Sequence, residues 1–241
     1  NRGTATGCGS RLPFPVPRSV ALVARSMIVE DDPEHKRLRG LVHKAFTPAA
    51  LKRLETRIER LTHELLDEAE PQGSVDLVKA YSLPIAVTVI KEMMGVSDED
   101  MPKFRDGLKV LTDGMSGWNV IRSMFWDLRR TRLFVKDLID RKRAEPQDDI
   151  LTGLIQAEEA GEKLSEDELI GMVFLLVFSG FETTVHLITN AVLTLLEHPE
   201  QLERLRSEPA LMESAVEEIL RYRGPIHATK PMYATEDVTL H

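Results

Sequence analysis

The sequence predicts a mainly α-helical protein, and two observations carry that prediction. Helix start and stop signals recur along nearly all of the 241 residues, whereas alternating strand patterns are almost absent. In addition, residues 169–196 are apolar almost all round, which is typical of a helix enclosed by other helices. With 42% hydrophobic residues and no internal repeat or linker, residues 1–241 are expected to form a single domain.

Proline and cap residues predict the first helices. Asp32 before Pro33 is expected to cap a helix that continues through about Phe46. Thr47 before Pro48 repeats this device for a second helix, which ends before residues 71–73. Further apolar periodicity, interrupted by Gly, Pro or Ser-Asp, predicts helices over residues 76–94, 98–111, 120–142 and 148–158.

The long apolar segment has its own start signal. Ser165 and Glu168 match a capping box, in which the serine oxygen and the glutamate carboxylate each satisfy an exposed backbone N–H. This helix is expected to end at His198-Pro199. The remaining predictions are short helices over residues 199–206 and 209–223 and an extended tail over residues 226–240.

Composition excludes several classes of partner. Lys and Arg number 31 and Asp and Glu 39, so the formal charge is -8 with both signs interspersed, which does not favour nucleic acid. The single cysteine, Cys8, excludes an internal disulfide framework and suits a reducing, cytoplasmic setting. No signal peptide is recognised, although the chain begins at Asn1. Glu182 at the centre of the apolar segment argues against a membrane span.

The polar cluster within the apolar segment is the sharpest feature of the sequence. Burying Glu182 and the hydroxyls of Thr183 and Thr184 costs several kcal/mol unless partners or water satisfy them. Gly180 would let another molecule approach the helix backbone, Thr183 can hold a water or an oxygen ligand, and Glu182 can supply protons. The alternative is a helix bent by Gly and by threonine bonds to the backbone, with Glu182 paired to a cation.

Two further pairs of residues have helical spacing. His35 and Arg39 are four residues apart and project from one helix face, where two donors can bind a pair of carboxylates. A solvated surface is the alternative for that pair. Glu218 and Arg221 are three residues apart among apolar neighbours, and form either a pair held against a core or a surface ion pair.

Together, and in this order, these segments resemble the cytochrome P450 family, specifically its soluble bacterial members, from about Ser26 onward. The helix with His35 and Arg39 looks like the one whose His and Arg bind haem propionates. Ser179-Gly180-Phe181-Glu182-Thr183-Thr184 looks like the distal oxygen-binding motif, with Ser179 where alanine or glycine is usual. Glu218-Ile219-Leu220-Arg221 looks like the Glu-x-x-Arg motif, and Ala234-Thr235-Glu236-Asp237-Val238 follows it.

The resemblance implies a role for each matching residue. Thr183 would hydrogen-bond dioxygen or its water, and Glu182 would serve the proton relay that promotes cleavage of the O–O bond. Leu175 and Phe178 would face the substrate. The other implied residues are those that contact haem b, His35, Arg39, Ser179, Gly180 and Thr184, and the ion pair of the haem-side core, Glu218 and Arg221. Implied partners are an apolar small molecule, O2 and an electron donor such as ferredoxin with its reductase.

The chain departs from the family pattern at the iron ligand. A haem-thiolate enzyme needs a cysteine sulfur on iron, which in the family lies well beyond the Glu-x-x-Arg helix, and Cys8 lacks the surrounding pattern. We therefore expect a P450-like domain without its C-terminal cysteine loop and N-terminal segment, with no metal ligand in this chain and no activity alone. The alternative is a truncated helical ligand-binding or interaction protein without redox activity.

The tail of the chain also departs from the family pattern, and the resemblance suggests which segments control substrate access. Met232 stands where many relatives have a propionate-binding arginine, and Lys230 shares its face in a strand. The resemblance places substrate access at residues 9–25 and 107–123. Met115, Trp118 and Met124 suit an apolar pocket or ordinary core packing.

Overall fold

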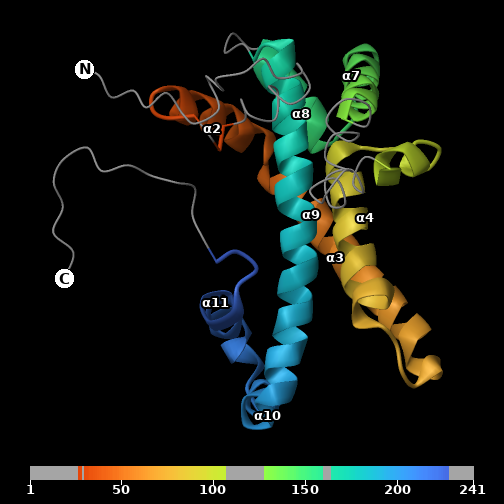
Figure 1. Cartoon of the computed structure of the whole chain (residues 1–241), viewed down its shortest axis with the longest axis vertical. Helices are drawn as coiled ribbons and strands as arrows, with labels where there is room; N and C mark the ends of the chain where they lie inside the picture. The colour runs from red at the N-terminus through yellow and green to blue at the C-terminus, as the bar shows by residue number, and fades with distance from the viewer. Residues whose placement is uncertain (1–26, 29, 107–127, 160–163, 228–241) are drawn as a thin grey trace, which may run out of the picture. The chain divides into compact units, whose positions relative to one another are not determined.

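The computed structural model describes residues 27–28, 30–106, 128–159 and 164–227. These residues are predominantly helical and none of them lies in a β-strand, which confirms the mainly α-helical prediction (Figure 1). The chain divides into two compact units. The first unit comprises Asn1–Leu51, Lys91–Phe178 and Thr229–His241, and the second comprises Lys52–Ile90 and Ser179–Ala228. A single domain therefore stays a prediction.

The first unit is built around α8 (Ile150–Glu159), which packs against both α2 (Glu34–Ala45) and α7 (Leu128–Ala144). Apolar residues at helical spacing on α2 supply one side of this core, because Leu38, Leu41 and Val42 are all buried. A Cβ atom at Gly153 would lie 3.3 Å from the Cα of Ala45, so the missing side chain lets α8 approach α2 closely.

Local signals placed two helix starts correctly and one incorrectly. Glu168 N–H donates to Ser165 Oγ at 3.2 Å and Ser165 N–H donates to Glu168 Oε2 at 2.6 Å, which confirms the capping box at the start of α9 (Glu166–Glu197). Thr47 Oγ1 likewise accepts the Ala50 N–H at the start of α3 (Pro48–Ala69). The prediction that Asp32 caps α2 is wrong, as Pro33 occupies the N-cap position without a side-chain hydrogen bond.

In the second unit, the C-terminal part of α9 runs antiparallel to the segment formed by the π-helix η2 (Val78–Ser82) and α4 (Leu83–Met94). Ser82 Oγ lies 3.2 Å from Thr189 Oγ1, and α9 meets α4 again at Gly180, which lies close to Ile90. The one-turn 3-10 helix η1 (Glu70–Gln72) follows α3.

The last elements of the second unit are α10 (Pro199–Ser207), the 3-10 turn η4 (Pro209–Leu211) and α11 (Met212–Arg223). Asn190 Nδ2 donates to the Arg223 carbonyl at 3.1 Å, and Arg223 Nη1 donates to Glu197 Oε2 at 2.9 Å. The rings of His198 and Tyr222 meet edge to face at 6.0 Å. These contacts fix the end of α11 against the end of α9. The predicted extended tail lies almost wholly outside the described residues.

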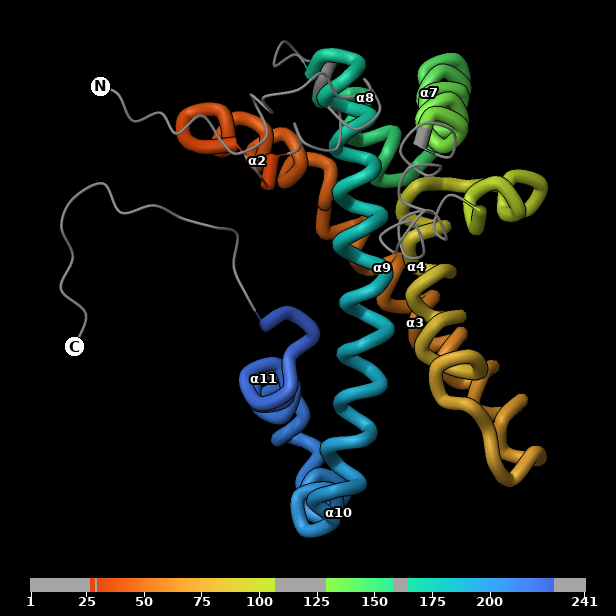
Figure 2. The backbone as a smooth tube through the Cα atoms, viewed as in Figure 1, coloured from red at the N-terminus to blue at the C-terminus, as the bar shows by residue number. Residues whose placement is uncertain are grey.

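Helix α9 is one unbroken helix of 32 residues (Figure 2). Most residues from Leu169 to Val177 are buried, as the sequence predicts, but most later residues are partly or fully exposed. The expectation that other helices enclose α9 therefore holds for its first part among the described residues. By length and composition alone α9 is long enough to cross a membrane, a test that the core helix of a soluble protein also passes.

The remaining predicted helices fit the structure where it describes them. Residues 101–106 are helical, which agrees with the start of the helix predicted over residues 98–111. Helix α7 begins at Leu128, and the first part of the helix predicted over residues 120–142 lies outside the described residues. Asp149 Oδ1 accepts the Thr152 N–H at 2.7 Å, which explains the start of α8.

Candidate functional site

The centre of α9 presents the predicted polar cluster on two adjacent faces. Ser179, Glu182 and Thr183 are spaced i, i+3 and i+4 and therefore share one face. Gly180 and Thr184, spaced i and i+4, share the next face. Thr183 Oγ1 donates to the Ser179 carbonyl and Thr184 Oγ1 donates to the Gly180 carbonyl at 2.7 Å. Both threonines thus donate to carbonyls of the preceding turn, as expected under the alternative that these hydroxyls are satisfied by the helix backbone.

Gly180 has a packing role within the second unit. A Cβ atom there would lie only 2.6 Å from Ile90 Cδ1 of α4, and Ile90 is itself buried. Any larger residue would force Ile90 to move. Close approach of α4 accounts for this glycine, and its predicted contact with haem stays a prediction, as does that of Thr184.

Glu182 is half-buried and not fully buried, as are Thr183 and Thr184. Its carboxylate has no hydrogen-bond or ion-pair partner within the described part of the chain, so the cation that the alternative requires is not found there. On the preceding turn Phe178 is 46% exposed and Leu175 is half-buried. The Glu182 carboxylate thus lies one helical turn from an accessible apolar side chain.

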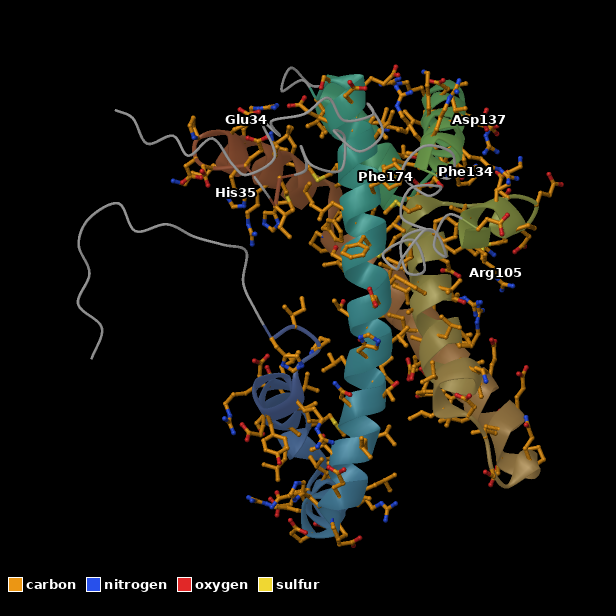
Figure 3. The ribbon with its side chains drawn as sticks, viewed as in Figure 1. Glu34, His35, Arg105, Phe134, Asp137 and Phe174 are labelled. Carbon is orange, nitrogen blue, oxygen red and sulfur yellow. The ribbon has the colours of Figure 1, made fainter. Side chains whose placement is uncertain are left out.

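The donors of α2 lie at the edge of its buried face. The half-buried His35 extends from α2 (Figure 3). Its Nδ1 lies 3.7 Å from Asp32 Oδ1. Arg39, one turn later, is exposed and has no side-chain partner among the described residues. Lys36 and, to a lesser extent, His35 lower the pKa of the Asp32 carboxyl. Arg39 is therefore available to an anion, and two such donors one turn apart fit a pair of carboxylates.

Glu218 and Arg221 form the ion pair that their spacing predicts. Arg221 Nε donates to Glu218 Oε2 at 2.7 Å and Arg221 Nη2 donates to Glu218 Oε1 at 2.6 Å. These bonds lower the pKa of Glu218 and raise that of Arg221. Their side chains are 59% and 70% exposed, so here the pair lies at the surface and not against a core. A part in the haem-side core stays a prediction.

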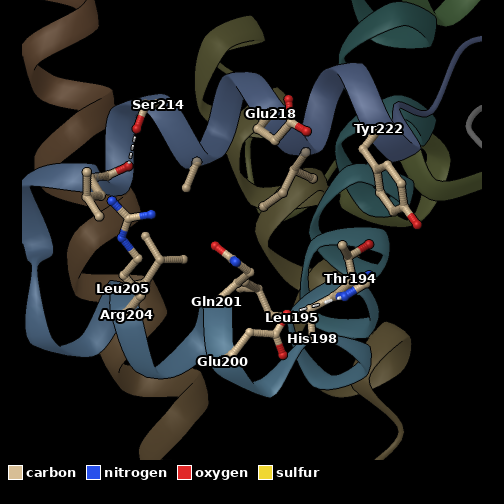
Figure 4. A pocket seen from close by; sticks show the side chains of 13 residues that line it. Thr194, Leu195, His198, Glu200, Gln201, Arg204, Leu205, Ser214, Glu218 and Tyr222 are labelled. Carbon is tan, nitrogen blue, oxygen red and sulfur yellow. Dashed lines mark hydrogen bonds and ion pairs between the residues drawn. The ribbon is translucent and has the colours of Figure 1, made fainter.

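A pocket of about 600 Å³ lies between the end of α9, α10 and α11 (Figure 4). Thr194 lines it, and this threonine is buried with its Oγ1 lacking a hydrogen-bond partner among the described residues. Glu218 contributes to the wall, as do the apolar residues Leu195 and Ile219. Sequence reasoning missed this pocket, because its walls come from three helices and none of the residues forms a recognisable motif.

Two ion pairs that join separate helices were also missed. Lys142 of α7 pairs with Asp149, seven residues later and just before α8, and Arg37 of α2 pairs with the distant Glu168 of α9. From the sequence alone, isolated charged residues are expected to lie on the solvated surface, and only the tertiary fold identifies their partners.

The predicted site residues fall into three groups that the structure describes separately. Ser179, Glu182 and Thr183 lie on α9 in the second unit, whereas His35 and Arg39 lie on α2 in the first. The ion pair of α11 belongs to the second unit. The remaining candidates, which lie outside the described residues, are Cys8, Met115, Trp118, Met124, Lys230 and Met232.

The chain matches a family model described as Cytochrome P450 over residues 127–241. It is 42% identical over 220 residues to Cytochrome P450 CYP107DY1 of Priestia megaterium. This alignment covers 90% of the present chain and 52% of that protein. It is 45% identical over 200 residues to Cytochrome P450 107B1 of Saccharopolyspora erythraea, covering 83% of this chain and 48% of that one. The chain spans about half the length of these curated relatives.

Solved structures give the same result. The polyketide synthase cytochrome P450 PksS of Bacillus subtilis superposes with a TM-score of 0.79 and 39% identity, over 85% of this chain and 52% of that one. P450BioI, solved with an acyl carrier protein ligated to hexadec-9Z-enoic acid, superposes with a TM-score of 0.74 and 32% identity, over 88% and 56%. With the ordered motifs on α2, α9 and α11, these matches show that the chain belongs to the cytochrome P450 family.

Proposed function

We propose that the complete protein is a cytoplasmic haem-thiolate monooxygenase, which inserts one oxygen atom of O2 into an apolar small molecule. Electrons would come from a redox partner such as ferredoxin and its reductase. The observation that carries this proposal is the face of α9 that combines Glu182 and Thr183 with the accessible Phe178 one turn earlier. The present chain alone is proposed to be inactive, because a thiolate ligand in the family's position is not among its residues.

Haem b fits the donors of α2. Its two propionates are carboxylates, and an accessible guanidinium with an imidazole one turn away is a donor set that can bind such groups. When bound, haem would supply oxygen activation, which no side chain of this chain supplies. His35 and Arg39 would hold the propionates, and Ser179, Gly180 and Thr184 are proposed to line the distal side.

Thr183 is proposed to hold a water molecule. Its hydroxyl hydrogen is already donated to the Ser179 carbonyl, so the hydroxyl oxygen is left to accept a hydrogen bond from a water. That water would then donate its other hydrogen toward the oxygen substrate. Glu182, whose carboxylate has no partner among the described residues, would return a proton to the water from bulk solvent.

An apolar substrate is supported by the side chains that precede the polar cluster. Leu175 lies four residues before Ser179 and Phe178 four residues before Glu182, on the same side of α9. Neither side chain offers a polar atom to a ligand. P450BioI, one of the similar structures, was solved with a fatty acyl chain on its carrier protein, which is consistent with this class of substrate.

The proposal is tested by removing the Thr183 hydroxyl from the complete protein without changing the side-chain shape. Thr183→Val is expected to uncouple the reaction, so that O2 consumption exceeds product formation. Thr62→Val is a matched control, because Thr62 Oγ1 of α3 also donates to the backbone four residues earlier, at 2.8 Å. Equal coupling in wild type and both variants would contradict the role of Thr183.

A helical ligand-binding protein without redox activity is the second candidate. The pocket between α9, α10 and α11 favours it, because the buried Thr194 hydroxyl there lacks a partner among the described residues. The two candidates differ in their prosthetic group. Haem titration of the complete protein separates them, since the second candidate predicts no change in the haem absorption spectrum.

A further inference from the structure

Three consecutive acidic residues in the first turn of α9 each meet a cation from another helix of the first unit. Glu166 Oε2 accepts from Lys136 Nζ at 3.2 Å, and Asp167 Oδ1 lies 3.7 Å from Arg132 Nη2, both cations being on α7. Glu168 Oε1 accepts from Arg37 Nη2 at 2.5 Å. We call Glu166, Asp167 and Glu168 the acidic turn. Arg37 is the residue of α2 that contacts the acidic turn among the described residues.

Arg37 lies on a different side of α2 from the donors that are proposed to bind haem. His35 and Arg37 are two residues apart, so their side chains diverge by about 200° around the helix axis. The buried face with Leu38 and Val42 lies between them. Arg37 also donates to Glu34 Oε1, from Nε at 2.8 Å and from Nη2, so its guanidinium is held between a carboxylate of α2 and one of α9.

Glu168 uses its two oxygens for two different contacts. Oε2 accepts the Ser165 N–H at 2.6 Å and the Ser165 hydroxyl at 2.7 Å, which completes the cap of α9. Oε1 is left for Arg37. The side chains of Arg37 and Glu168 are 33% and 26% exposed, so solvent screens this contact less than a fully exposed pair. One carboxylate thus joins the start of α9 to α2.

We propose that Arg37 is a positioning residue: its bond to Glu168 fixes the rotation of α2, and with it the side on which His35 and Arg39 are presented. Packing of the apolar face of α2 against α8 sets that rotation coarsely, because burial of apolar surface is not itself directional. A charge-assisted hydrogen bond to a capped helix end is directional. The part that concerns haem rests on the proposed function, whereas the anchoring of α2 does not.

The anchoring is tested by hydrogen exchange on this chain. Arg37→Gln is expected to make the α2 amides over residues 34–45 exchange about fivefold faster. Arg132→Gln is the matched control, because Arg132 meets the neighbouring Asp167 from α7 with 19% and 28% of the two side chains exposed. It should leave exchange in α2 within twofold of wild type. Equal effects of the two variants on α2, or none, would overturn the proposal.

The link to His35 and Arg39 is tested by the affinity of the complete protein for haem, followed by its absorption band at a temperature where all variants are folded. Arg37→Gln should weaken binding about tenfold, as loss of a supporting contact typically does, and Arg132→Gln should not. Unchanged affinity in Arg37→Gln would overturn the positioning role. A wild-type protein that binds no haem would instead overturn the proposed function, while exchange in α2 would still decide the anchoring.

Discussion

Lys142 and Asp149 form an ion pair with only 4% and 5% of their side chains exposed. Lys142 is near the end of α7 and Asp149 precedes α8, so the pair joins two helices of the first unit. Gln147 also accepts a hydrogen bond from Lys142 Nζ, and Asp149 caps α8 through Thr152. Both charges are therefore satisfied by partners although they are removed from water.

Removing one of these partners should be costly. Lys142→Met leaves the Asp149 carboxylate buried without its cation, which typically destabilises a protein by about 3–5 kcal/mol. Urea unfolding of the chain measures this difference. Lys136→Met is the matched control on the same helix, because Lys136 is more exposed and should change stability little. Similar midpoints for the two variants would show that the buried pair is unimportant.

Gly95 should tolerate no side chain. It has φ of +58°, and a Cβ atom would lie 2.1 Å from both Lys142 Nζ and Asp149 Oδ2. Gly95→Ala is therefore expected to destabilise the chain by about 1–3 kcal/mol, as measured by thermal unfolding.

Gly40 gives the opposite expectation for the same substitution. It lies inside α2, and a Cβ atom there would meet nothing within 4 Å. Gly40→Ala should stabilise the chain by about 0.5–1 kcal/mol, because alanine loses less backbone freedom than glycine on folding. If both alanine variants change stability in the same direction, the close approach at Gly95 is not the determining factor.

Stability should depend on pH through Glu168. Burial raises its pKa, but the bonds from Ser165 and Arg37 outweigh burial and hold the pKa below the usual value of 4.5. The unfolded chain thus binds a proton at a higher pH than the folded chain does. The stabilisation that ionised Glu168 gives to the folded state is therefore present above pH 4.5. It is lost as the pH falls through the lower pKa that Glu168 has in the folded chain.

Glu168→Gln isolates this contribution. The difference in unfolding free energy between wild type and Glu168→Gln should be largest near neutral pH and should shrink below pH 4.5. Urea unfolding at several pH values measures it. A difference that does not vary between pH 7 and the acid range would argue against the bonds to Ser165 and Arg37.

Helix caps could be predicted from the sequence where the capping side chain has no competing partner nearby. The capping box of Ser165 and Glu168 and the cap at Thr47 both form as predicted. Asp32 does not cap α2: the helix starts one residue later than predicted, with Pro33 at the N-cap, and the Asp32 carboxylate pairs with Lys36 Nζ at 2.7 Å. A sequence pattern alone does not show which of two local partners an aspartate takes.

Contacts between elements were not predictable. The distant pair Arg37–Glu168 depends on how α2 packs against α9, and the pair Lys142–Asp149 depends on how the turn between α7 and α8 folds, whereas the sequence shows only the charged residues. The apolar composition of α9 predicts that the whole helix is buried. It does not show how far along α9 the neighbouring helices extend. The structure therefore corrected the exposure of Glu182, while the motif itself was recognisable from residue type and order.

The absorption spectrum of the complete protein, reduced under carbon monoxide, tests the proposed haem-thiolate site most directly. We predict the band typical of thiolate-ligated haem in the complete protein and its absence in the present chain, whose one cysteine, Cys8, is not expected to ligate iron. A complete protein without this band, or the same band in the present chain, would contradict the account.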